Sequence, residues 1–253
     1  MNAKGIRTLL AGAALSVIGS ATVVQAQNAP LPFAPVLQIG STDLVGGTVT
    51  ANTDGSFTLV GQQQGGSFNG GAVWDLAWDL TLNQDPSIAG TLTLTNLTTT
   101  TRNFNLQFVL PVTPTFSPSV FGGSITATAT DANNNSVLEL APIAVSPSIY
   151  RGQIDGSTVL SLFAANLTCL ASGPGCVASG TESDGLPGPT NPGPGVASSI
   201  ALLLNFSLTP GDRVVFDTNF TVEPPTPVPL PAALPLMLLG VGALGGLRRR
   251  REA

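Results

Sequence analysis

The clearest pattern of apolar and polar positions along this chain is an alternation with a period of two. Between Trp74 and Leu82, every even position is a large apolar residue and every odd position is polar or small. Successive side chains of a β-strand point to opposite faces of a sheet, so the pattern predicts a strand with one buried face. A helix would scatter the same residues around its axis. The predicted core positions of this strand are Trp74, Leu76, Trp78, Leu80 and Leu82.

Shorter versions of this alternation recur along the chain, and turn sequences separate them. Asn-Thr-Asp-Gly at 52–55 and Thr-Pro-Gly-Asp at 209–212 are typical of tight turns. The pattern indicates no amphipathic helix and no internal repeat between the two ends of the chain. We therefore expect an all-β protein, a single antiparallel β-sandwich over residues 36–223. Further strands are predicted at 57–60, 91–95, 104–108, 124–128, 137–140, 149–154, 159–163, 200–208 and 213–222.

The predicted body loosely resembles an immunoglobulin-like sandwich. The resemblance is carried by Thr-Asn-Leu at 95–97, Arg-Asn-Phe-Asn-Leu at 102–106 and Leu-Thr-Pro-Gly-Asp at 208–212, but the Cys-Trp-Cys hallmark of antibody domains is absent. Residues 171–197 interrupt the strand rhythm with clustered glycine and proline. They predict a long flexible loop. A stiff proline-rich spacer is expected at 224–229.

The N-terminal end has the three parts of a secretory signal peptide. Two basic residues, Lys4 and Arg7, precede an apolar run that ends in small residues. We expect export through the Sec translocon and cleavage by signal peptidase after residue 26. This cleavage leaves residues 27–35 as a short leader. A permanent N-terminal membrane helix is the alternative. The residues that define the predicted cut are Val24, Ala26 and Gln27.

The C-terminal end combines a proline-rich motif, an apolar segment and a basic cluster. Residues 230–247 contain no charge and no hydrogen-bonding side chain. As a helix rising about 1.5 Å per residue, they would span roughly 27 Å, enough to cross a hydrocarbon core. Basic residues stay on the cytoplasmic side, so the body should lie outside the cytoplasm. The motif consists of Val228, Pro229, Leu230, Pro231 and Ala232, and the basic cluster of Arg248, Arg249, Arg250 and Arg251.

The order of these C-terminal features resembles the sorting signal of the PEP-CTERM class of exported bacterial proteins. The motif is similar to its VPLPA-CTERM variant, with Leu230 in place of the glutamate of Pro-Glu-Pro, and the resemblance covers residues 227–251. It implies that exosortase, an integral-membrane cysteine peptidase of Gram-negative bacteria that make exopolysaccharide, recognises and removes the tail. The inner membrane would then hold the protein transiently, before it reaches the cell surface or a biofilm matrix. A tail anchor that is never cut is the alternative.

The charge of the body limits its partners. Thirteen acidic residues and only three arginines remain between the two ends, and charged residues make up 9% of the chain. Binding of nucleic acid depends on Lys and Arg that neutralise phosphates, so this class of partner is excluded. An anionic polysaccharide would be repelled unless divalent cations bridge it to the protein. Exopolysaccharide stays a candidate partner.

The absence of histidine limits the chemistry. It excludes Ser-His-Asp and Cys-His nucleophile pairs and almost every catalytic zinc site. No glycine-rich phosphate loop stands between a strand and a helix. We expect no metal, no cofactor and no enzymatic activity. Cys169 and Cys176 are predicted to form one disulfide in an oxidising compartment, with free thiols or an intermolecular bridge as alternatives.

Two aspartates and two tryptophans of the clearest strand could still serve carbohydrate chemistry. Asp75 and Asp79 are four residues apart on the outward face, so about 13 Å separates their backbones. Glycosidases need their carboxyl groups roughly 5 to 9.5 Å apart, which favours solvated surface residues here. Trp74 and Trp78 could form a sugar-stacking platform, but they share the face of Leu76, which favours core packing.

A further motif imitates half of a calcium-binding loop. Asp131, Asn133 and Asn135 follow the pattern D-x-N-x-N, but Ser136 replaces the expected glycine and Pro142 the expected glutamate. An Asn-rich turn is the favoured interpretation. The leading hypothesis is thus a non-enzymatic exported envelope or matrix protein. The alternatives are a secreted carbohydrate-active enzyme or sugar-binding module, and a permanently tail-anchored periplasmic protein.

Overall fold

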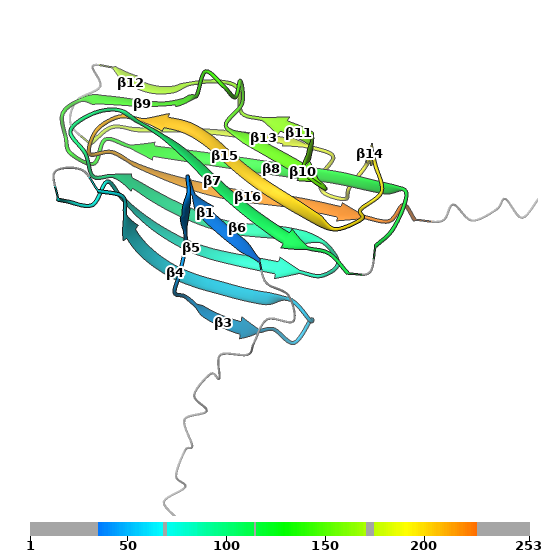
Figure 1. Cartoon of the computed structure of the whole chain (residues 1–253). Coiled ribbons are helices and arrows are strands. Elements are labelled where there is room, and N and C mark those ends of the chain that lie inside the picture. Colours follow the sequence, from blue (N-terminus) through cyan, green and yellow to red (C-terminus); the bar gives the residue numbers. More distant parts are fainter. Residues whose placement is uncertain (1–34, 68–69, 114, 171–174, 227–253) are drawn as a thin grey trace, which may run out of the picture.

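The protein is a β-sandwich in the residues that its computed structural model describes, which are 35–67, 70–113, 115–170 and 175–226 (Figure 1). Two antiparallel sheets face each other across one hydrophobic core. In these ranges all named elements are strands, and no helix there is long and apolar enough to cross a membrane. The predicted signal helix and C-terminal membrane helix lie outside the described residues.

The first sheet has eight strands, with the order β11-β10-β15-β7-β1-β2, and in addition β9 pairs with β15 and β12 pairs with β9. These strands are β1 (Val36–Ile39), β2 (Thr42–Asp43), β7 (Arg102–Pro111), β9 (Val137–Pro142), β10 (Tyr150–Ile154), β11 (Ser157–Leu162), β12 (Leu167–Leu170) and β15 (Ser199–Leu208). Its centre is formed by β15 and β7, which pair over ten residues each.

The second sheet also has eight strands, in the order β13-β8-β16-β6-β5-β4-β3, with β14 added beside β8. They are β3 (Thr48–Ala51), β4 (Phe57–Gly65), β5 (Trp74–Asn83), β6 (Ser87–Asn96), β8 (Ser119–Thr130), β13 (Val177–Asp184), β14 (Asn191–Gly193) and β16 (Arg213–Glu223). Figure 1 shows these strands as a twisted layer that extends from β13 and β8, near β15, down to β4 and β3.

The core forms where the alternating apolar positions of both sheets meet. On β5 the buried residues are the five even positions that the sequence predicts, and the odd positions face outward or lie at the edge of the core. Phe206 of β15 and Phe216 of β16 pack edge to face across the core, with ring centroids 4.9 Å apart. The Tyr150 hydroxyl also reaches across it, to the backbone of β16. The prediction of a β-sandwich is confirmed.

The structure corrects the prediction of a flexible loop at 171–197. This stretch contains β13 and β14, which both pair with β8 along one edge of the second sheet. β13 has the sequence Val-Ala-Ser-Gly-Thr-Glu-Ser-Asp, without a row of large apolar residues, and most of its residues are exposed at the edge of the sheet. The side chain of Phe163 lies against Gly180, and Glu182 accepts a hydrogen bond from the backbone N–H of Phe163.

Candidate functional site

A groove lies on the outer face of the second sheet, above β4, β5 and β6. Its volume is about 360 Å³. Side chains on the outer face of a strand recur at every second residue, so three neighbouring strands contribute alternate positions to one surface. The groove is lined by Val60, Gly61, Gln62, Ala77, Trp78, Asp79, Thr91 and Thr93.

Strand register brings the polar groups of the groove together. Ala77 lies opposite Gln62 on one side and opposite Thr93 on the other. One step along the strands, Asp79 lies opposite Val60 and Thr91. Residues directly opposite each other have Cβ atoms about 4.5 to 5.5 Å apart. An amide, a carboxylate and two hydroxyls therefore surround a small apolar floor.

This combination of groups suits a neutral polar ligand. The amide and hydroxyls both donate and accept hydrogen bonds, and the carboxylate accepts them. The apolar floor at Ala77 and Val60 can contact C–H groups. Among the described residues that line the groove, Asp79 alone has an ionisable side chain. Asp217 of β16 does not line the groove. It lies opposite Thr91 of β6, which in turn lies opposite Asp79 of β5, so about 9.6 Å separates the backbones of the two aspartates.

The structure places the other carbohydrate candidates differently. Trp74 and Trp78 are only 5% and 2% exposed, which confirms that they pack in the core. Asp75 lies on the outer face, where Gln62 and Gln64 donate hydrogen bonds of 2.9 and 2.8 Å to its two oxygens. Sequence reasoning found the two aspartates but missed Gln62 and the threonines. Only the pairing of β4 and β6 with β5 brings those residues to the groove.

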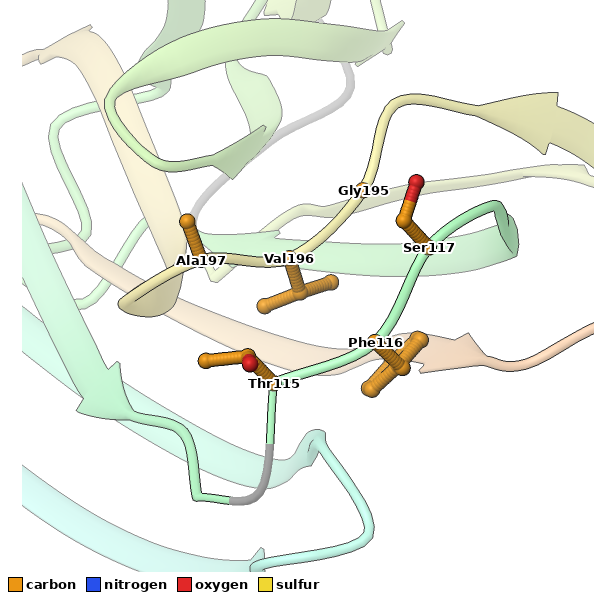
Figure 2. A pocket seen from close by; sticks show the side chains of 6 residues that line it. All are labelled: Thr115, Phe116, Ser117, Gly195, Val196 and Ala197. Carbon is orange, nitrogen blue, oxygen red and sulfur yellow. The ribbon is translucent and has the colours of Figure 1, made fainter.

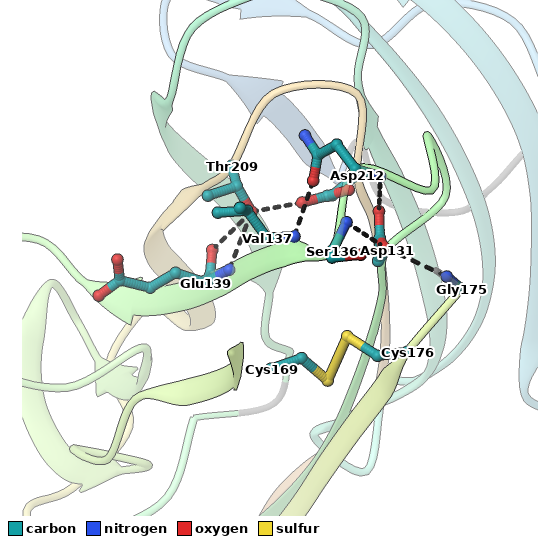
Figure 3. The surroundings of a disulfide bond; sticks show 10 residues. Asp131, Ser136, Val137, Glu139, Cys169, Gly175, Cys176, Thr209 and Asp212 are labelled. Carbon is teal, nitrogen blue, oxygen red and sulfur yellow. Dashed lines mark hydrogen bonds between the residues drawn. A yellow bond between two sulfur atoms is a disulfide. The ribbon is translucent and has the colours of Figure 1, made fainter. Parts of the chain in front are cut away.

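The Asp131 loop is a series of turns (Figure 3). One oxygen of the buried Asp131 carboxylate accepts the N–H of Asn135, and the other accepts the N–H groups of Ser136 and Gly175. The side-chain oxygens of Asn133 and Asn135 each accept a backbone N–H two residues ahead. These bonds use the same oxygens that a cation would need. Among the described residues, no three acidic or cysteine side chains form a group that could hold a metal ion.

Asp212 is buried beside Asp131 and accepts a hydrogen bond from the Thr209 hydroxyl (Figure 3). Burial, together with the negative charge of Asp131, raises the pKa of the Asp212 carboxyl above its ordinary value. The two carboxylates converge beneath the surface and not in a groove. The backbone N–H of Ala132 donates to Asp212, and the Asn133 amide donates to the Pro210 carbonyl, so these bonds hold the turn between β15 and β16 against the Asp131 loop.

Cys169 and Cys176 are joined by a disulfide in the structure (Figure 3). Cys169 belongs to β12 and Cys176 directly precedes β13. The carbonyl of Cys176 also accepts a hydrogen bond of 2.9 Å from the N–H of Asp131. The disulfide therefore ties the edges of both sheets to the Asp131 loop.

A further hollow of about 370 Å³ lies where the segment before β8 meets the segment before β15 (Figure 2). Phe116 and Val196 form a two-residue antiparallel bridge there. None of the described side chains that line this hollow is ionisable, and the polar ones are the hydroxyls of Thr115 and Ser117. It offers less chemistry than the groove.

The predicted sorting and signal residues lie outside the described part of the chain, so the structure gives no geometry for the motif at 228–232, the arginines at 248–251 or the cut behind residue 26. No family model matches the chain, and no curated protein is detectably similar to it.

Proposed function

We propose that the protein is a non-enzymatic, exported component of the cell envelope or extracellular matrix, sorted and cleaved by an exosortase at its C-terminal tail. The signal peptide at 1–26 and the sorting signal at 228–251 support this proposal. The acidic charge of the body and the absence of histidine agree with it. We also propose that both ends of the chain form helices and that the sandwich is immunoglobulin-like.

The observation that carries a role for the body is the groove over β4, β5 and β6. Gln62, Asp79, Thr91 and Thr93 offer the amide, carboxylate and hydroxyl groups that hydrogen-bond to sugar hydroxyls, and Ala77 provides an apolar floor. Its described lining side chains include one carboxylate and no cation, so the groove favours a neutral polysaccharide over an anionic one. The body would thus hold matrix polysaccharide after its release from the membrane.

Two outer-face alanines allow a matched test of this role. Ala77 lies inside the groove and Ala89 lies outside it on the neighbouring strand, and both are half-buried. Ala77→Arg should fill the groove and reduce retention on a neutral exopolysaccharide in affinity electrophoresis at least about tenfold, while Ala89→Arg should keep it, because each adds the same charge to the same sheet. Equal retention of both variants would exclude the groove as the binding site.

Mass spectrometry of the protein's termini tests the sorting proposal separately. Secreted material should begin at Gln27 and end near Pro231, while the membrane fraction retains the tail. Arg248 to Arg251 present on all material would instead favour the permanently anchored periplasmic protein.

A carbohydrate-active enzyme is the competing function. It would have to use Asp79 together with Asp217, whose backbones are about 9.6 Å apart. Inverting glycosidases place their carboxyl groups at roughly 6.5 to 9.5 Å. If the protein hydrolyses the retained polysaccharide, and both Asp79→Asn and Asp217→Asn abolish this hydrolysis, the enzymatic function replaces the binding proposal.

A further inference from the structure

The Asp79 carboxylate in the groove over β4, β5 and β6 has no partner within the described part of the chain. Asp79 is exposed on the outer face of β5, and no hydrogen bond or ion pair joins its side chain to another described residue. It lies opposite Val60 and Thr91, which carry no positive charge. A carboxylate only accepts hydrogen bonds, and it binds a charged donor most strongly. The groove therefore offers a free anionic acceptor.

Asp75 shows the contrast on the same face of β5. Gln62 and Gln64 donate hydrogen bonds of 2.9 and 2.8 Å to its two oxygens, so the protein itself satisfies this carboxylate. Gln62 also lines the groove, and its amide oxygen has no partner among the described residues. The hydroxyls of Thr91 and Thr93 are further acceptors in the lining. The groove is richer in acceptors than in donors, so a ligand that supplies donors fits it best.

The charge of the surrounding face favours a cationic donor. Asp217 lies about 9.6 Å from Asp79 across the strands, and Asp75 lies about 13 Å from it along β5. Arg213 is the one basic residue in the strands of the second sheet, and it lies four residues, about 13 Å, before Asp217 on β16. The negative potential of this face attracts ammonium groups, and the attraction weakens with salt.

The free carboxylate lets the groove select among sugars. We propose that its preferred ligand is a polysaccharide of amino sugars with free, protonated amino groups. The ammonium group of one sugar donates to Asp79 and to the Thr91 hydroxyl, whose Cβ atoms lie about 4.5 to 5.5 Å apart across the strands. The ring hydroxyls bond to Gln62 and Thr93, and the C–H face of the ring packs on Ala77. This inference depends on the sugar-binding role that we propose for the groove.

The test compares two hexasaccharides with the same β-1,4 linkage. The glucosamine hexamer carries an ammonium group on each ring where cellohexaose carries a hydroxyl. Binding to the mature protein is measured by isothermal titration calorimetry at about pH 5.5, where amines and exposed carboxylates are both charged. The parent should bind the glucosamine hexamer at least about threefold more tightly than cellohexaose, and the advantage should shrink in about 0.5 M salt.

Two aspartates provide matched variants. Asp79→Asn should lower the affinity ratio of the two hexamers about threefold or more, because the amide keeps the size of the side chain and loses its charge. Asp85→Asn removes the same charge from the turn between β5 and β6. The end of β5 at Asn83 is already about 13 Å from Asp79, so this control should keep the ratio within about 1.5-fold of the parent's.

Three results would overturn the amino-sugar preference. One is equal binding of both hexamers by the parent, and another is an equal loss of the ratio in the two aspartate variants. The third is a hexalysine peptide that binds as tightly as the glucosamine hexamer and loses as much affinity in Asp79→Asn, since the groove would then be a general cation site. Equal binding of both hexamers that Ala77→Arg abolishes would overturn the preference and leave the proposed function standing. Equal polysaccharide retention by Ala77→Arg and Ala89→Arg would overturn both.

Discussion

The hydroxyl of Tyr150 in the first sheet donates a hydrogen bond of 2.7 Å to the backbone carbonyl of Asn219 in the second. The Tyr150 ring is fully buried between the sheets, and burial raises the pKa of its hydroxyl above the ordinary value. The hydroxyl therefore stays protonated and remains a donor at any physiological pH. The bond links β10 to β16 across the core.

Tyr150→Phe removes this bond and keeps the ring. We expect the free energy of unfolding to fall by about 1 to 2 kcal/mol, the usual cost of a lost buried hydrogen bond. Urea denaturation followed by circular dichroism measures it. Thr128→Val, which removes a hydroxyl from the outer face of β8, is the matched control and should change stability by less than about 0.5 kcal/mol. Equal effects of the two variants would show that the cross-sheet bond contributes nothing.

Asn96→Ala should be among the most damaging polar substitutions. The fully buried Asn96 amide donates to the carbonyls of Thr100, Leu208 and Thr209, and its oxygen accepts from the N–H and hydroxyl of Thr98. Its loss leaves buried carbonyls without donors. We expect a loss of about 3 kcal/mol, or roughly 6 to 12 °C in Tm.

Asn83→Ala is the control for Asn96. Asn83 lies at the end of β5, and its side chain accepts one exposed backbone hydrogen bond, from Asp85. Its substitution should cost less than about 1 kcal/mol in the same thermal scan. A Tm of Asn96→Ala within a few degrees of the parent's would contradict the network's importance.

Asp155→Asn should lower stability at neutral pH but not in acid. The Asp155 carboxylate accepts hydrogen bonds from the N–H groups of Ala197, Ser198 and Ser199 and from the Ser198 hydroxyl. Partial burial acts in the opposite direction, but the hydrogen bonds outweigh it and hold the pKa of Asp155 below its ordinary value. Its stabilisation is therefore complete above about pH 4, the ordinary aspartate value, and is lost as the pH falls through the lower folded value.

The measurement for Asp155 is the free energy of unfolding at pH 7 and at pH 2 to 3. The difference between the parent and Asp155→Asn should be about 1 to 2 kcal/mol at pH 7, discounted for an exposed site, and should shrink in acid. Asp85→Asn, in the turn between β5 and β6, should show no such difference. A deficit of Asp155→Asn that is the same at both pH values would contradict the charge-based account.

Asp212→Asn should act with the opposite sign. Because burial raises the pKa of Asp212, the stability that depends on its protonated form is full below about pH 4 and is lost as the pH rises through the folded value. Asparagine cannot ionise, and its amide can donate to Asp131. We expect a gain of about 1 kcal/mol at pH 7 that disappears in acid, measured by urea denaturation.

Asp131→Asn is the paired control for Asp212. The Asp131 carboxylate accepts three backbone N–H groups, so its neutralisation should destabilise the protein at pH 7. A loss of stability in Asp212→Asn at pH 7 would mean that the folded protein favours the Asp212 anion.

The strand β5 shows how far local pattern carries a prediction. Its ends and its buried face follow from the alternation at 74–82, because side-chain direction in a strand depends on the residue number alone. β13 shows the limit. Its residues are small and polar, and it forms a strand because the edge of β8 offers it hydrogen bonds over eight residues. Such pairing involves residues about 50 positions apart, which no local pattern reports.

The amino-acid sequence determined the class of this protein: all-β architecture, an acidic body without histidine chemistry, and two ends whose motifs predict export and sorting. These properties are local, since each depends on residue type or on spacing within one segment. The tertiary structure decided which segments meet. Register placed Gln62, Asp79 and Thr93 in one groove. Such sites exist only after strands distant in the chain pair and pack, because their geometry arises from long-range contacts.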